Sequence, residues 1–587
     1  MNSAVSQSTS PIETLPRRKT IRALFLAYIG ACLLAFVPAV ATPFFLDDFL
    51  HASMVEGTFP AHRSAFDLYD FVDDSDRAAM LDRGLLPWWT HPHLTIRFFR
   101  PLASALLWVD HRVFAANALP MHIHSLAWWV VAVLGARRLF ARWLSPRAAM
   151  LATIIFAVSP CHAMPLGWLA NREVLLSLAF GTFALGALAR FRDDGRGRDA
   201  IAAFVLFALA LLGGGEYALC FGGYVVAMEV VRRRDPLARR VASWLPFALP
   251  AAAYLLARAR LGYGTAGSGF YSDPLHDPSA FLRKLPWRAT ALFADGWLTA
   301  DANFLETWQK WIVAGLVVAF AIGLYVSVRR AFAKLAPERR TTSTWLALGS
   351  LFALGPVLAV VPSLRLLGIA MLGIAPTVAV VLEHAWFPDG PEERSRDANI
   401  ERLVAIALGF AHFIHGPMTT FLEARQLRKD ASEFGARVAW IRERTHDPTT
   451  AEIGVVRGMA PAFFAPFGVD PRGRTPARWN VLAQCGHVLV LRKDTRTFEL
   501  RVAENRSIYP AGDGNLYRSD DAPLRVGDVQ SASGMTATIL AVGPNGPTRV
   551  SIGLDEDPSR MLWLRDDTEE LREAELPEPG FGAPFDP

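Results

Sequence analysis

The sequence predicts a mainly α-helical protein, in which a polytopic bundle of transmembrane helices precedes a small β-rich C-terminal domain. The 587 residues are 52% hydrophobic and the mean hydropathy is +0.24, which is too apolar for a soluble domain. Several windows approach the roughly 20 apolar residues that cross the hydrocarbon core of a bilayer. From about residue 423 the composition turns polar and hydrophobic residues begin to alternate, as they do in strands.

The predicted spans follow one another through the first 421 residues. The first apolar run, 24–41, ends in Ala39-Val40-Ala41, which resembles a signal-peptidase site. We expect an uncleaved anchor, because the run is longer than the core of a usual signal peptide. Further runs lie at 123–140, 148–166, 174–188, 200–212, 217–231, 244–256, 311–328, 344–361, 366–382 and 403–421. About eleven spans are therefore predicted.

The charge of the connections predicts an orientation. Arginine and lysine concentrate in alternate connections, at 137–147, 190–198, 232–240, 329–340 and 394–402. By the positive-inside rule the N-terminus is cytoplasmic, and the loops 47–100 and 258–310 lie on the outer face. An odd number of spans also places the C-terminal domain outside. We expect a multi-pass protein of the bacterial inner membrane, whose net charge of +5 needs no nucleic acid.

We divide the chain into a transmembrane domain, 1–422, and a β-rich extracytoplasmic domain, 423–587. Leu427, Phe434, Val438 and Ile441 have the spacing of a helix at the start of the second domain. Strands are predicted at 488–491, 498–502, 538–542 and 549–554. The last two flank the turn sequence 543–547, which predicts a hairpin.

Two adjacent carboxylates, Asp47 and Asp48, directly follow the first apolar run. They are flanked by Phe44, Phe45 and Phe49. In such surroundings desolvation and mutual repulsion raise the pKa of at least one carboxyl, which makes it a usable general base toward a hydroxyl. The alternative is a solvated helix end, but ionisable groups at the boundary of a membrane usually mark chemistry or transport.

Four arginines, Arg97, Arg100, Arg172 and Arg365, are predicted on the otherwise arginine-poor outer face. Each could extend toward lipid headgroups. Together they could form a bidentate clamp on a phosphate.

Two further residues are candidates near the same face. His162 follows Ser159-Pro160-Cys161 and either binds substrate or orders a turn. Glu216 follows three glycines between two apolar runs, so it needs a partner or a proton. The glycines allow either a break in the helix or the close approach of another helix.

The outer loops hold three more features. Trp88 and Trp89 are expected at the membrane interface. The glycine-rich segment 262–269 lacks a P-loop lysine and is expected to be a flexible loop. Five acidic residues offer oxygen ligands for a divalent cation, or form a solvated loop: Asp67, Asp70, Asp73, Asp74 and Asp76.

Several fragments, taken in order, resemble the GT-C superfamily of polyprenyl-phosphate-sugar-dependent glycosyltransferases. The chain is most similar to bacterial relatives of the transmembrane tetratricopeptide-repeat O-mannosyltransferases, although it lacks the repeats. The resemblance covers roughly the first 230 residues. Its motifs are Asp47-Asp48, Arg100-Pro101-Leu102, Asn117 to His122, Phe156 to His162 with Trp168 and Arg172, and Glu216. Ser159, Gly215 and Ser125 stand where relatives often carry His, Lys and Asn.

The resemblance implies an inverting glycosyltransferase of the cell envelope. A polyprenyl-phosphate-linked monosaccharide would be the donor, and a lipid, glycan or protein hydroxyl the acceptor. Asp47 or Asp48 would act on the acceptor hydroxyl, and arginines would stabilise the departing lipid phosphate. The implied substrate-binding residues are Arg97, Arg100, His122, His162, Arg172, Glu216 and Arg365. No cofactor is firmly implied, and a divalent cation stays open.

Two other functions stay open. A transporter would have two similar halves with broken helices in matching positions, and the sequence shows no such halves. A non-catalytic membrane scaffold that displays the C-terminal domain is the other alternative.

Overall fold

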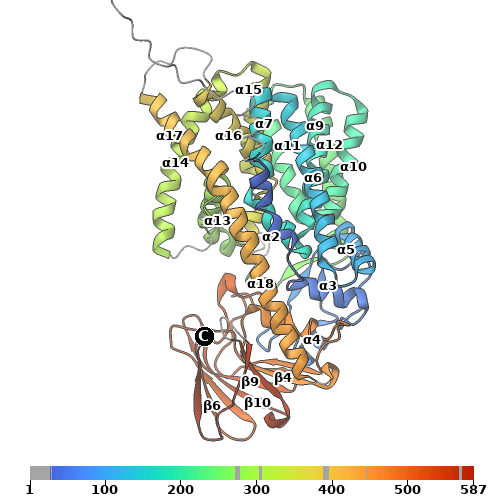
Figure 1. The fold of residues 1–587 in the computed structure, drawn as a ribbon, viewed down its shortest axis with the longest axis vertical. Coiled ribbons are helices and arrows are strands. Elements are labelled where there is room, and N and C mark those ends of the chain that lie inside the picture. Colours follow the sequence, from blue (N-terminus) through green and yellow to red (C-terminus); the bar gives the residue numbers. More distant parts are fainter. Residues whose placement is uncertain are drawn as a thin grey trace, which may run out of the picture.

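A stack of long helices leads into a β-rich region in the computed structural model (Figure 1). The structure describes residues 27, 29–271, 278–302, 307–387, 396–445, 447–566 and 571–586. Residues 24–26 of the first apolar run, and Arg394 of the last arginine-rich connection, lie outside this description. The helix α18, Gly416–Arg444, runs from the helical part down to the β-rich part (Figure 1).

The described residues contain seven helices that are long and apolar enough to cross a membrane. An eighth span results if the bent pair Pro146–Ala157 and Pro160–Gly167 counts as one. The segments Ile29–Val40 and Met371–Trp386 are shorter apolar helices. The protein is therefore a multi-pass membrane protein, as predicted, while the number of about eleven spans stays a prediction.

Several helices of the bundle begin or end at residues that favour a helix end. Asn117 and Ser145 cap helices with their side chains, and Gly215, at φ +61°, ends one where the glycines predicted a break. The remaining helices are α2 (Val37–Val40), α3 (Asp47–Glu56), α4 (Arg77–Asp82), α5 (Pro101–Phe114), α6 (Ala118–Trp143), α7 (Pro146–Ala157), α8 (Ala163–Gly167), α9 (Glu173–Asp194), α10 (Gly197–Gly214), α11 (Gly222–Val231), α12 (Leu237–Arg260), α13 (Pro278–Leu298), α14 (Thr307–Ala333), α15 (Pro337–Phe352), α16 (Met371–Trp386) and α17 (Arg396–Phe410).

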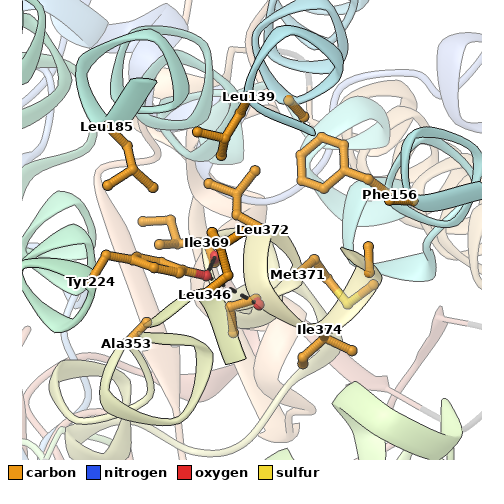
Figure 2. Packing of buried hydrophobic residues seen from close by; sticks show 14 of the residues in the cluster. Leu139, Phe156, Leu185, Tyr224, Leu346, Ala353, Ile369, Met371, Leu372 and Ile374 are labelled. Atoms are coloured by element: carbon orange, nitrogen blue, oxygen red, sulfur yellow. Dashed lines mark hydrogen bonds between the residues drawn. The ribbon is translucent and has the colours of Figure 1, made fainter. Parts of the chain in front are cut away.

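The centre of the bundle is apolar and closely packed (Figure 2). Leu139, Leu185, Leu346 and Leu372 come from four different helices and meet there. Tyr224 is also fully buried, and its hydroxyl donates to the carbonyl of Ile369 at 2.7 Å. Its one polar atom is thus satisfied, as burial requires.

The C-terminal region contains two sheets. The larger has the order β13-β6-β7-β10-β9-β8, and the smaller has the order β12-β11-β4-β5. Their strands are β4 (Glu452–Arg457), β5 (Arg478–Val481), β6 (Val488–Arg492), β7 (Thr497–Arg501), β8 (Val529–Ala532), β9 (Met535–Gly543), β10 (Gly546–Leu554), β11 (Leu562–Asp566), β12 (Leu571–Glu573) and β13 (Gly582–Phe585). All four predicted strands and the hairpin, in which Gly543 faces Gly546, are confirmed. The helix predicted from Leu427 onward is α18.

A third sheet joins the loops 47–100 and 258–310. It consists of β1 (Asp70–Val72), β2 (Thr95–Arg97) and β3 (Gly264–Ala266), in that order. The expectation of a flexible loop at 262–269 is therefore wrong, because the main chain of β3 pairs with the edge of β2. That pairing gives hydrogen-bond partners to main-chain N–H and C=O groups, which the side chains of a glycine-rich segment do not cover.

The loop 47–100 packs against the C-terminal region in one hydrophobic core. Trp88 and Trp89 are both buried there, and the indole of Trp88 donates to the carbonyl of Leu482 at 3.0 Å. Their predicted place at the membrane interface is therefore wrong. The division at 422/423 stays a prediction, and α18 runs across it as one helix.

Arginine-rich connections gather at the other end of the bundle. Arg192 pairs with Glu229, and Arg232 pairs with Asp193 at 2.7 Å. The loop 47–100 with α3 and α4 lies at the end that faces the sheets (Figure 1). The arginine-rich connections 190–198 and 232–240 thus lie at the end away from the sheets, and the orientation in the membrane stays a prediction.

Candidate active site

A strained turn places the acidic pair at the start of α3. Leu46 has φ +44° and ψ −108°, which is unusual for a residue other than glycine. Asp47 and Asp48 are the first two residues of the helix that follows. Free main-chain N–H groups at a helix start favour negative charge, so the position itself suits carboxylates.

The two carboxylates have different surroundings. Asp48 is 1% exposed and accepts hydrogen bonds from the main-chain N–H groups of Phe45, at 3.0 Å, and Ala170, at 2.9 Å. Asp47 is half-buried and has no hydrogen bond or ion pair with any described residue. Asp48 therefore closes the turn, while Asp47 is left to interact with another molecule.

Burial raises the pKa of Asp47 to about 7. The positive charges of Arg365 and Arg100 oppose this shift, and the negative charge of Glu173 adds to it. Burial also raises the pKa of Asp48, against the two main-chain hydrogen bonds that it accepts. Asp47 thus has the protonation behaviour of a general base that works near neutral pH.

Arg100 and Arg365 are the two cations that act on Asp47. Arg100 lies 3.3 Å from Glu173 and over the rings of Tyr69 and Phe98, at 5.0 and 4.5 Å. Its Nε is buried and has no hydrogen-bond partner among the described residues. Arg365 lies 5.7 Å over the ring of Trp168. Both guanidinium groups keep donors that an anion could use.

Two residues of this cluster were not predicted as site residues. Glu173 is 5% exposed and accepts hydrogen bonds from Asn171, at 2.9 Å, and from Arg100. Tyr271 pairs with Val360 in an isolated β-bridge, and the charges of Arg365, Arg100 and Asp47 all act on its phenol. Glu173 follows Arg172 in the sequence, which could have drawn attention to it. Nothing in the sequence singles out Tyr271.

Arg172 is 1% exposed and forms a buried ion pair with Asp110. It also donates to the hydroxyl of Ser125, at 2.8 Å, and to the carbonyl of Met121, at 2.7 Å. All three guanidinium nitrogens are therefore engaged within the protein. The structure does not bring Arg172 into the cluster of Arg100 and Arg365 as a phosphate donor.

Arg97 and Glu216 are engaged with other side chains. Arg97 pairs with Asp70 at 2.9 Å and lies 4.6 Å over the ring of Tyr263. Glu216 accepts a hydrogen bond from Arg258 at 2.5 Å, and its charge acts on Arg100. Glu216 therefore adjoins the cluster, while Arg97 holds the three-stranded sheet together.

The two predicted histidines are fully buried and contact main-chain carbonyls. His122 contacts the carbonyls of Leu166, at 2.8 Å, and Thr42, at 3.0 Å. His162 contacts the carbonyl of Phe156 at 2.9 Å. These contacts join segments of the bundle, and for His162 they match the turn-ordering alternative.

The acidic segment that offered oxygen ligands for a cation is bound within the protein. Its partners are Ser64 and Tyr263 for Asp67, Arg63 and Arg97 for Asp70, Ser75 for Asp73, Arg77 for Asp74, and Arg63 for Asp76. Within the described ranges, no three His, Cys, Asp or Glu side chains come together in a way that could hold a metal ion. The carboxylates that would have to bind the cation thus form ion pairs with arginines and hydrogen bonds with hydroxyl groups.

Comparisons with known proteins give similarities to solved structures alone. No family model and no curated protein matches the chain. The archaeal oligosaccharyltransferase AglB from Archaeoglobus fulgidus, in complex with an inhibitory peptide and a dolichol-phosphate, is 14% identical with a TM-score of 0.42. The match covers 78% of this chain and 64% of AglB, so the chain spans less than two thirds of that protein.

Two further solved structures are similar. ArnT from Cupriavidus metallidurans, bound to undecaprenyl phosphate, is 12% identical with a TM-score of 0.39, and the match covers 77% of this chain and 89% of ArnT. The arabinosyltransferase EmbB from Mycobacterium smegmatis is 14% identical with a TM-score of 0.34, over 90% of this chain and 48% of EmbB.

The buried pair of Arg172 and Asp110 gives a first prediction. We expect Arg172→Ala to lower the free energy of unfolding by about 3–5 kcal/mol, because it leaves Asp110 buried without its partner. Thermal unfolding in detergent would measure this loss. Arg196→Ala, at a side chain 57% exposed, is the control and should change stability by less than about 1 kcal/mol. Equal stability of the two variants would contradict the structural role of Arg172.

Proposed function

We propose that the protein is an inverting glycosyltransferase of the GT-C type. It transfers a monosaccharide from a polyprenyl-phosphate donor to a hydroxyl acceptor on the outer face of the membrane. The observation that carries the proposal is the unpaired Asp47, with a pKa raised to about 7, beside Arg100 and Arg365. A base for a hydroxyl and donors for a phosphate are the two groups that this transfer needs.

In the proposed reaction, Asp47 accepts the proton of the acceptor hydroxyl. The hydroxyl oxygen attacks the anomeric carbon from the face opposite the lipid phosphate, and the bond from that carbon to the phosphate oxygen breaks. The phosphate leaves with the electron pair and gains negative charge. Arg365 and Arg100 stabilise that charge, and Glu173 holds Arg100 in place at 3.3 Å.

We place the reaction on the outer face of a bacterial inner membrane, with the N-terminus in the cytoplasm. The support is the place of two arginine-rich connections in the bundle. Arginines of the connections 190–198 and 232–240 gather at one end, as expected of the cytoplasmic side. Asp47 and the sheets lie at the other end, which would also put the C-terminal region outside.

A transporter or a scaffold would not need an unpaired base. A scaffold would tolerate the loss of the Asp47 carboxylate and would depend on the C-terminal region. The variants below therefore separate the proposed enzyme from both alternatives.

Asp47→Asn gives the central test. After the donor sugar is identified by mass spectrometry of co-purified lipid, transfer is measured with that labelled polyprenyl-phosphate sugar in membrane vesicles. We expect the variant to lose transfer by a factor of about 10²–10⁴, because its amide cannot accept the proton. Asp494→Asn, in a turn of the C-terminal region, is the control and should keep full activity. Transfer that survives in Asp47→Asn would refute the proposed base.

The pH dependence of the wild type tests the same residue. Transfer should rise as the pH increases through about 7, because only the deprotonated carboxylate of Asp47 accepts a proton. The sign follows from burial, which keeps the carboxyl protonated below that pH. Initial rates between pH 5 and 9 would show this limb, and a flat profile would contradict it.

Arg365→Ala tests the phosphate side. We expect the affinity of this variant for undecaprenyl phosphate, measured in nanodiscs, to fall by about tenfold or more. The reason is that a charge-assisted hydrogen bond contributes about 1.5–3 kcal/mol. Arg97→Ala is the matched control, because that arginine is used by Asp70, and its affinity should stay unchanged. Equal affinities for wild type and Arg365→Ala would rule out this role of Arg365.

A further inference from the structure

The two arginines of the candidate site lie on the faces of aromatic rings. The guanidinium carbon of Arg100 is 5.0 Å from the ring centre of Tyr69 and 4.5 Å from that of Phe98. The guanidinium carbon of Arg365 is 5.7 Å from the ring centre of Trp168. An aromatic face is electron-rich and attracts a cation, but it accepts few of the N–H groups that a guanidinium offers.

This kind of contact leaves hydrogen-bond donors free. Among the described residues, Arg100 has one hydrogen bond, from Nη1 to Glu173 at 3.3 Å, and its buried Nε has no partner. Arg365 has no hydrogen bond or ion pair with any residue that the structure describes. Arg172, which is held by polar groups instead, uses all three of its nitrogens within the protein. The rings therefore hold Arg100 and Arg365 without using the donors that a phosphate needs.

Tyr69 connects Arg100 to the turn that carries the acidic pair. Tyr69 is 2% exposed, and its hydroxyl donates to the carbonyl of Ala170 at 2.8 Å. The N–H of Ala170 in turn donates to the carboxylate of Asp48 at 2.9 Å. The ring of His51, one turn further along α3, lies 5.1 Å from the ring of Tyr69. The ring that carries Arg100 is thus fixed to the segment that holds Asp48.

Trp168 makes the same kind of connection for Arg365. Its indole N–H donates to the carbonyl of Phe45 at 3.2 Å, and the rings of the two residues are 6.1 Å apart. The N–H of Phe45 donates to Asp48 at 3.0 Å. Two rings from separate segments of the chain therefore join an arginine to a residue whose N–H group holds Asp48.

We infer that Tyr69 and Trp168 are positioning residues for the phosphate of the donor lipid. The inference rests on the proposed function. Each ring has two separable parts. Its face holds an arginine and so acts on the affinity for the lipid phosphate. Its O–H or N–H group holds the turn at Asp48 and so acts on the position of the neighbouring base, Asp47.

Removal of the rings tests the first part. We expect Tyr69→Leu and Trp168→Leu each to lower the affinity of the full-length protein for undecaprenyl phosphate in nanodiscs by about three- to tenfold, because the guanidinium loses its aromatic face. The matched control is Trp440→Leu, whose ring carries Arg444 at 3.7 Å near the end of α18. The control should keep the affinity of the wild type. Unchanged affinity in the two site variants would overturn the inference.

Double variants separate this effect from general damage to the fold. In the Arg365→Ala background, Trp168→Leu should lower the affinity no further, because the ring acts through that arginine. Tyr69→Leu should likewise have no further effect in the Arg100→Ala background. A ring that matters only for packing would lower the affinity by the same factor with and without its arginine. Such additive losses would overturn the inference.

Conservative variants test the second part. Tyr69→Phe and Trp168→Phe keep an aromatic face and lose the polar atom. Their affinity for undecaprenyl phosphate should stay within about twofold of the wild type, while sugar transfer falls by about three- to tenfold through the loss of one hydrogen bond. Unchanged transfer, or a loss of affinity as large as in the leucine variants, would overturn the inference.

The two readouts also distinguish this inference from the proposed function. A wild type that binds undecaprenyl phosphate but transfers no sugar would refute the proposed function, while the affinities of the leucine and double variants would still decide whether the rings position the arginines. A wild type without affinity for undecaprenyl phosphate would overturn both.

Discussion

The arrangement of the site depends on one buried carboxylate. Asp48 accepts hydrogen bonds from Phe45, on its own turn, and from Ala170, at the start of a long helix of the bundle. These two bonds offset part of the cost of burying the carboxylate and hold a turn in which Leu46 has a positive φ. Because Asp48 is used in this way, Asp47 can stay unpaired beside it. The two carboxylates thus differ: Asp48 has a structural part, and Asp47 has no partner among the described residues.

The segment 169–173, which belongs to the helical bundle, holds residues of this site in place. Its successive residues contact different parts of the site: the N–H of Ala170 holds Asp48, Asn171 holds Glu173, and Glu173 holds Arg100. Arg172 fixes the segment itself through Asp110, Ser125 and Met121. One buried ion pair therefore fixes the segment that holds both Asp48 and, through Glu173, Arg100, although Arg172 has no free donor for a ligand.

The sequence predicted the parts of the fold that depend on local patterns. The helix at Leu427–Ile441 and the hairpin at 538–554 follow from periodicity and turn residues close together in the chain. The parallel pairing of β4 with β11 was not predicted, because it joins segments that are far apart. Trp88 and Trp89 were misplaced for the same reason: their environment is made by the C-terminal region. For the candidate site, which stays a prediction, the sequence named Asp47 and four arginines, but it could not show that Arg97 pairs with Asp70 and Arg172 with Asp110, because these carboxylates are distant in the chain.

The loop 47–100, which carries the acidic pair, packs against the C-terminal region in one hydrophobic core. On the bundle side stand charged groups, Arg100, Glu173 and Arg365, held by helices and short turns. On the other side stand aromatic groups such as Phe45, which pack against that apolar core. Burial raises the pKa of Asp47 to about 7, and the positive charges of Arg365 and Arg100 keep it from rising further.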